Sequence, residues 1–158
     1  MAKAKVEFVL KGDEELIKIL KKMDYKDMQK AYKKALTTSV KPLVSETKKN
    51  LKRTNIKNVN TAYIGKNGKK YKSMLQGVMS SVDVRKPNDN YAKIHIMGEF
   101  RLKWFEKGTS IRKTYRKGLR GRILPRFFFK QAVGSVGDKC RDSLEMNIRK
   151  SIQQIWEK

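Results

Sequence analysis

The sequence predicts an α+β domain, in which an antiparallel sheet of about three to four strands packs with two long helices, the second helix and the C-terminal one. Two long stretches repeat apolar residues every three or four positions, as the buried face of a helix does. Several short segments alternate apolar and polar residues, as strands with one buried face do. With 158 residues the chain can bury a modest core, so we expect residues 1–158 to form a single domain.

The N-terminal region predicts a strand followed by a short helix. Apolar and polar residues alternate over residues 6–10, and Gly12 ends that pattern. Asp13 belongs to the residue types that cap helix N-termini, and helical spacing follows to residue 23. We therefore expect a strand at 6–10 and a helix at 13–23.

A long second helix is predicted from about residue 27 to residue 52. Apolar residues fall broadly on one face, and lysines crowd the rest, which we interpret as a solvated face. Pro42 interrupts the pattern, because a mid-helix proline loses a hydrogen bond and clashes with the preceding turn. We expect a kink or a break between residues 38 and 41.

Residues 53–72 form a polar segment rich in Asn, Gly and basic residues. Its Gly-Lys-Asn-Gly stretch at 65–68 predicts a turn at the tip of a long loop or a loose hairpin. A long loop in a small domain is usually functional or disordered. Tyr63, Ile64 and Tyr71 favour a segment that becomes ordered on contact with a partner, so we expect these residues at a subunit interface.

Two strand-like segments follow, at about residues 75–85 and 91–97, with a turn at 87–90 between them. An antiparallel hairpin is the natural pairing. His95 shares a face with polar neighbours and is expected to be solvated or at an edge.

The last third of the chain predicts a two-turn helix over residues 100–106, stopped by Gly108, and a long helix from about residue 126 to residue 156. Pro125 marks the start of the long helix. Its apolar stripe is the clearest in the chain and consists of Val133, Val136, Cys140, Leu144, Ile148, Ile152 and Ile155.

Three consecutive phenylalanines, at positions 127, 128 and 129, cannot all face one core on a helix, because successive residues lie about 100° apart. At least one must point elsewhere. We expect Phe127 and Phe128 to contribute to a subunit interface.

The chain shows no pattern of a catalytic or metal site. It contains one histidine and one cysteine, and it has no Walker-type phosphate loop and no Gly-x-Ser-x-Gly elbow. Glu106 stands alone in an aromatic turn, which favours a structural acceptor of backbone N–H groups or of an arginine over a general acid. We therefore expect no enzyme, no cofactor and no metal.

The single cysteine also bears on the compartment. Cys140 has no partner for an intrachain disulfide, which favours a reducing environment, and its helical spacing favours a packed side chain over a nucleophile. No apolar stretch is long enough to span a bilayer, and the N-terminus lacks a signal-peptide pattern. We expect a protein made in the cytoplasm, with no membrane contact.

The charge predicts an anionic partner. The chain carries 39 Lys and Arg residues against 15 Asp and Glu, a net charge of +24, and its pI is near 10.2. The basic excursion at 109–122 is the leading candidate for contact with phosphate groups, and contact with an acidic neighbouring protein is the alternative. The residues concerned are Arg112, Lys113, Arg116, Lys117, Arg120 and Arg122.

The order of the motifs resembles a known family. An aromatic-Glu-x-Gly-Thr turn at 105–109 precedes a Pro-x-Phe stretch at 125–132, and residues 39–44 read Ser-Val-Lys-Pro-Leu-Val. With the strand at 6–10 and the helix at 13–23, this order is similar to that of the head–tail joining, or tail-completion, proteins of long-tailed lambdoid-type bacteriophages and prophages. The resemblance covers nearly the whole chain.

The resemblance implies a structural virion protein of the phage neck, the junction between the DNA-filled head and the tail. It implies a homo-oligomeric ring, sixfold or twelvefold, that contacts other neck, portal-adaptor and tail proteins and lets genomic DNA pass without sequence selection. A free-standing basic nucleic-acid-binding protein is the alternative. The residues expected at the subunit interface are Tyr63, Ile64, Tyr71, Trp104, Phe105, Glu106, Gly108, Thr109, Pro125, Phe127 and Phe128.

Overall fold

The computed structural model describes residues 25–84, 92–111, 118, 119 and 121–156. The predicted α+β class is confirmed, because these residues form helices and two antiparallel strand pairs. The strand predicted at 6–10 and the helix predicted at 13–23 lie outside the described residues, as does the turn predicted at 87–90.

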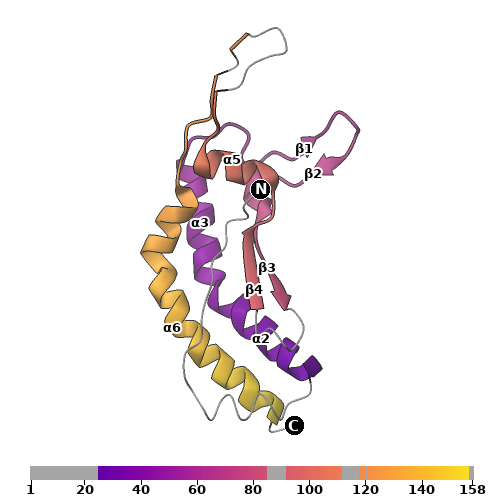
Figure 1. Cartoon of the computed structure of the whole chain (residues 1–158), viewed down its shortest axis with the longest axis vertical. Helices are drawn as coiled ribbons and strands as arrows, with labels where there is room; N and C mark the ends of the chain where they lie inside the picture. Colours follow the sequence, from indigo (N-terminus) through magenta and orange to yellow (C-terminus); the bar gives the residue numbers. More distant parts are fainter. Residues whose placement is uncertain (1–24, 85–91, 112–117, 120, 157–158) are drawn as a thin grey trace.

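The described elements follow one another as helices and strand pairs (Figure 1). Their bounds are α2 Tyr25–Ser39, α3 Lys41–Arg53, β1 Tyr63–Ile64, β2 Lys70–Tyr71, α4 Met74–Gly77, β3 Val78–Val84, β4 Ala92–Met97, α5 Phe100–Lys107 and α6 Phe128–Trp156.

The predicted second helix is interrupted where Pro42 requires it. Helix α2 ends at Ser39 and α3 begins at Lys41, with proline in the first turn of α3, where its missing N–H costs little. Val40 joins the two helices, donating to Leu36 at 3.1 Å and accepting from Val44 at 3.0 Å. The hydrogen bonding thus continues through the junction, and the expected kink or break lies within residues 38–41.

Within the described residues the strands form two separate pairs, where one sheet of three to four strands was expected. Strand β1 pairs antiparallel with β2, and β3 pairs antiparallel with β4, with a register shift between Val78 and Ser81. Strands β1 and β2 have two residues each and point away from β3 and β4 in Figure 1. They are too short and too distant to continue the ladder of the longer pair.

Helix α4 is a single turn that the alternating pattern did not predict. The strand expected from residue 75 begins instead at Val78, because Ser73 and Gln76 form a capping box. The Gln76 amide donates to the Ser73 hydroxyl at 3.1 Å, and the Ser73 amide donates to the Gln76 side chain at 3.2 Å.

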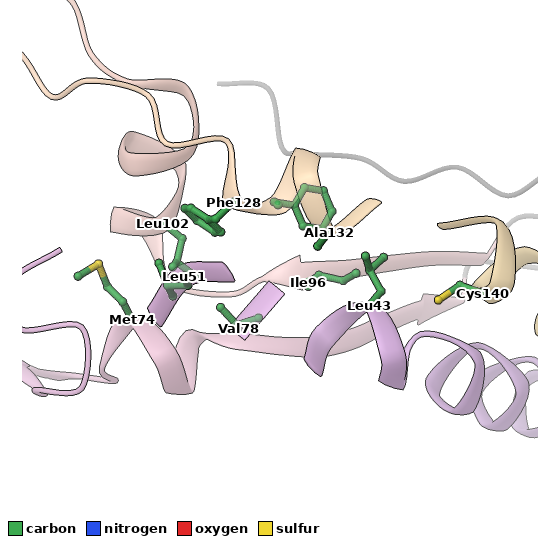
Figure 2. Packing of buried hydrophobic residues seen from close by; sticks show 10 residues of the cluster. Leu43, Leu51, Met74, Val78, Ile96, Leu102, Phe128, Ala132 and Cys140 are labelled. Atoms are coloured by element: carbon green, nitrogen blue, oxygen red, sulfur yellow. The ribbon is translucent and has the colours of Figure 1, made fainter. Parts of the chain in front are cut away.

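Helix α6 runs along α2 and α3. Strand β3 of the β3–β4 pair also packs against α2 and α3. One core cluster joins residues of α3, α4, β3, β4, α5 and α6, and Figure 2 shows their side chains converging. A second cluster joins α2, Val40, β4 and the C-terminal half of α6. The predicted stripe of α6 supplies Cys140 and Leu144 to these clusters, together with Ile148 and Ile152.

Cys140 is buried, as its helical spacing predicted. Burial raises the pKa of its thiol, and a hydrogen bond with the Leu43 backbone lowers it by less. Such a thiol is a packed side chain rather than a nucleophile. Within the described residues, no helix is both long and apolar enough to cross a membrane.

Candidate interaction surface

Glu106 joins the end of α5 to the start of α6. Its carboxylate accepts the backbone N–H of Phe129 at 2.8 Å and that of Lys130 at 2.9 Å, and the residue is only 5% exposed. These N–H groups belong to the first turn of a helix, where backbone donors lack partners and a negative charge is favoured. The predicted role of Glu106 as a structural acceptor is confirmed.

Gly108 and Thr109 fix the adjoining segment. The Thr109 amide donates to the Ile123 carbonyl at 2.9 Å, and the Ile123 amide donates to the Thr109 hydroxyl at 3.0 Å. Gly108 has φ +73°, and a Cβ there would lie 2.8 Å from the Ile123 carbonyl and 2.9 Å from Cδ of Pro125. Only glycine fits both requirements. The two sequence motifs therefore form one structural unit.

The segment between α5 and α6, residues 109–127, we call the arm, and its described residues are 109–111, 118, 119 and 121–127. In Figure 1 these described residues reach past the N-terminal end of α6. Several of its large apolar side chains are exposed, namely Ile111 at 57%, Leu119 at 72%, Leu124 at 53% and Phe127 at 45%. Arg122 is exposed as well. The predicted contacts of Arg112, Lys113, Arg116, Lys117 and Arg120 lie outside the described residues.

The phenylalanine triplet divides as helical geometry requires. Phe128 is fully buried and Phe129 is 9% exposed, whereas Phe127 is 45% exposed, so at least one ring points outward as predicted. Phe127 has φ +51°, a left-handed conformation that keeps it out of the helix. Helix α6 therefore begins at Phe128, two residues later than the sequence predicted.

Five residues of the expected subunit interface make contacts within their own chain. Phe128 and Glu106 are buried within their own chain, and Phe105 packs against the same core cluster. Gly108 and Thr109 hold the base of the arm. All five residues thus make contacts within one chain. The sequence motif alone could not distinguish such contacts from contacts between subunits.

Four aromatic rings form a continuous row, which we call the aromatic ladder. Tyr63 lies 5.8 Å from Tyr71, Tyr71 lies 5.6 Å from Phe100, and Phe100 lies 5.1 Å from Trp104, measured between ring centroids. Tyr63, Phe100 and Trp104 are 41–45% exposed, and the adjacent Ile64 is 60% exposed. Phe100 was not among the residues expected at an interface, although its spacing of four from Trp104 on α5 places both on one helix face.

Arg101 holds the β1–β2 hairpin against α5. Its Nε lies 2.8 Å from the Glu99 carboxylate, its Nη2 donates to the Lys72 carbonyl at 2.9 Å, and its guanidinium carbon lies 5.3 Å from the Tyr63 ring centroid. The Glu99 side chain is 4% exposed and also accepts the Arg101 amide. A buried, hydrogen-bonded ion pair thus positions the first ring of the ladder.

The described residues contain no cluster of three or more metal-ligating side chains. His95 is half-buried on β4. An open groove of about 530 Å³ lies at the start of α6, and its lining carries amide, hydroxyl and guanidinium groups but no carboxylate, imidazole or thiol. The lining residues are Asn50, Arg53, Thr54, Asn55, Arg126 and Gln131.

Comparison with protein-family models, curated proteins and solved structures finds no significant match to this chain.

Proposed function

We propose that this chain is a structural virion protein of the phage neck, which forms a homo-oligomeric ring between the DNA-filled head and the tail and lets DNA pass. The arm carries the proposal. It holds Leu119 and Leu124 in water at 72% and 53% exposure, outside the packed helices. Contact with a neighbouring protein removes such apolar surface from water, which is favourable in proportion to the area buried.

The contacts at the base of the arm support the resemblance to neck proteins. The turn at 105–109 and the stretch at 125–132 are separate motifs in the sequence. In the structure Glu106 and Gly108 bring them together, and both then serve to hold one projecting segment. The two motifs occur in one chain because both are needed to fix the base of the arm.

An arm that contacts a different surface of the next copy gives a head-to-tail interface. Such interfaces close into rings when the rotation between subunits permits it. The proposed ring is sixfold or twelvefold, with other neck, portal-adaptor and tail proteins as neighbours, at the head–tail junction of the virion. Its channel carries DNA, for which a net charge of +24 provides attraction without sequence preference.

The proposed interface uses the exposed residues of the arm. It includes Pro125 and Phe127 from the sequence-based set, together with Ile111, Leu119 and Leu124. Tyr63, Ile64 and Trp104, from the same set, are exposed as well and stay candidates. Phe105, Glu106, Gly108, Thr109 and Phe128 instead act within the chain, as described above.

The test deletes the gene from the phage or prophage that encodes the chain and examines the particles by electron microscopy. We expect DNA-filled heads and finished tails that fail to join, and joining restored by the wild-type gene. The double variant Leu119→Ser, Leu124→Ser should fold yet fail to restore joining. Met146→Ser, at a similarly exposed site on α6, is the matched control and should restore it.

Joined, infectious particles in the absence of the gene would overturn the proposal. The alternative, a free-standing nucleic-acid-binding protein, predicts that result. It also predicts a small defined oligomer that prefers one DNA sequence well above nonspecific DNA.

A further inference from the structure

In the two described segments that carry the aromatic ladder, 61–73 and 99–108, the exposed charged side chains are all basic. Segment 61–73 contains four lysines and neither Asp nor Glu. Segment 99–108 contains three basic residues and two glutamates, but both glutamates are 5% exposed and bonded within the chain. The basic residues of the two segments are Lys66, Lys69, Lys70, Lys72, Arg101, Lys103 and Lys107.

The rings of the ladder present surface that a flat ligand can use. Their planes meet at 34°, 72° and 83°, so no pair stacks face to face and conceals its surface. The Arg101 guanidinium lies over Tyr63, and the Lys69 ammonium lies 5.8 Å from the Tyr71 ring centroid. A cation therefore lies beside each of the first two rings, and the ion pair with Glu99 fixes the position of Arg101.

We propose that the aromatic ladder binds single-stranded nucleic acid, with unpaired bases stacking on Tyr63, Phe100 and Trp104 and the lysines contacting phosphates. Every base has a flat face that stacks on an aromatic ring regardless of sequence, and a single strand brings phosphates to the cations. This inference does not rest on the neck assignment. It places a nucleic-acid site on the β1–β2 hairpin and α5 rather than on the basic part of the arm.

Other occupants match the surface less well. A duplex offers phosphates but keeps its bases stacked inside, so the rings would remain in water. An acidic peptide uses the lysines alone. A second copy of the chain could cover the rings, but with 15 acidic residues against 39 basic ones it offers the seven cations few anionic groups.

The experiment titrates the purified full-length protein with an oligothymidylate of about 16 nucleotides and follows tryptophan fluorescence. The chain has two tryptophans, so a Trp156→Phe background makes Trp104 the reporter. We expect quenching on binding, and about tenfold weaker binding when Trp104 is replaced by Leu, because one stacking ring is lost. That variant needs fluorescence anisotropy of a labelled strand as the readout.

Salt dependence separates stacking from charge. Trp104→Leu should leave the slope of log affinity against log salt unchanged. Lys69→Ser with Lys70→Ser should make that slope less steep by about 1.4, since each phosphate contact on a single strand contributes about 0.7 to its magnitude. Lys33→Ser with Lys41→Ser removes the same charge from exposed positions on α2 and α3 and is the matched control. It should leave the affinity for the single strand close to that of the parent protein.

Three results would overturn the proposal. The first is binding of a matched duplex or of polyglutamate as tightly as the single strand, with no effect of Trp104→Leu. The second is a Lys33, Lys41 control that weakens binding as much as the Lys69, Lys70 variant. The third is self-association without nucleic acid that Trp104→Leu abolishes in sedimentation, which would assign the ladder to a contact between copies.

Discussion

The helical body and the hairpin-and-arm end of this molecule are held together in different ways. The helical body comprises α2, α3 and α6 with the β3–β4 pair. It is held by rows of apolar side chains, such as Leu144, Ile148 and Ile152, that repeat along a helix and meet Ala31 and Ala35 of α2. The hairpin-and-arm end comprises β1, β2, α4, α5 and the arm. It contributes Met74 and Leu102 to the core, and polar contacts of two buried carboxylates hold the rest. Glu106 binds amides of α6, and Glu99 binds Arg101, whose guanidinium reaches the Lys72 carbonyl.

The difference explains where the apolar surface is exposed. Ten large hydrophobic residues among those described are exposed, and eight of them lie at the hairpin-and-arm end. Those eight are Tyr63, Ile64, Phe100, Trp104, Ile111, Leu119, Leu124 and Phe127. Polar anchors help to fix the shape of this end, and these eight side chains lie outside its core. They remain available to partners.

The largest expected effect tests the boundary between the two regions, which passes through the phenylalanine triplet. Phe128→Ala should lower the free energy of unfolding by about 3–5 kcal/mol, because it removes a fully buried ring and leaves a cavity. Phe127→Ala should change it by less than about 0.5 kcal/mol, because the ring is 45% exposed. Urea unfolding followed by circular dichroism measures both.

Equal losses from the two substitutions would show that Phe127 is held by the fold as firmly as Phe128. The arm would then belong with the helical body, and the boundary between the two regions would not lie between Phe127 and Phe128.

The helices of the body could be predicted from the sequence, whereas the contacts of the hairpin-and-arm end could not. The reason is that the first depend on neighbouring residues and the second on residues far apart in the chain. Helical periodicity is local, so α2, α3 and α6 were predicted to within about two residues, and Pro42 located the break between α2 and α3. Glycine chemistry is local as well, so the hairpin turn at 65–68 and the stop at Gly108 were predicted.

The contacts that sequence reasoning could not supply join residues far apart in the chain. The start of α6 depends on Glu106, which lies more than twenty residues before the amides it binds. The position of the β1–β2 hairpin depends on Arg101 reaching the Lys72 carbonyl. One local signal was overlooked: Ser73 and Gln76 have capping-box spacing, but a four-residue helix is too short to show periodicity.

A smaller effect is expected where a polar anchor of the hairpin-and-arm end is removed. Glu106→Ala should cost about 2–3 kcal/mol of unfolding free energy, because two backbone N–H groups at the start of α6 lose a charged acceptor. Glu145→Ala is the matched control on the same helix, since its carboxylate is 59% exposed and pairs with Arg149 at 3.2 Å. That variant should change the free energy by less than about 0.5 kcal/mol.

Urea unfolding of the Glu106 and Glu145 variants gives both free energies directly. A cost for Glu106→Ala no greater than that of the control would mean that the arm is held by its apolar contacts, as the helical body is.

The smallest effect concerns α4, the single turn that links the hairpin to β3. Ser73→Ala removes a hydroxyl that accepts the Gln76 amide at 3.1 Å from a 2% exposed position, so we expect a loss of about 1 kcal/mol. Ser135→Ala is the control, because that hydroxyl is exposed on α6 and donates to the Gln131 carbonyl, so its removal should be nearly neutral.

Hydrogen exchange locates the loss caused by Ser73→Ala. Amides of segment 63–77 should exchange faster while those of α6 keep their protection, since the capping box secures only the turn beside the hairpin. A uniform increase that includes α6 would mean that α4 is part of the cooperative helical body. A local increase would separate a hairpin fixed by single polar contacts from a body fixed by many apolar ones.

Loosening confined to the hairpin would also predict that Ser73→Ala disturbs the first two rings of the aromatic ladder, Tyr63 and Tyr71, before it affects Phe100 and Trp104 on α5.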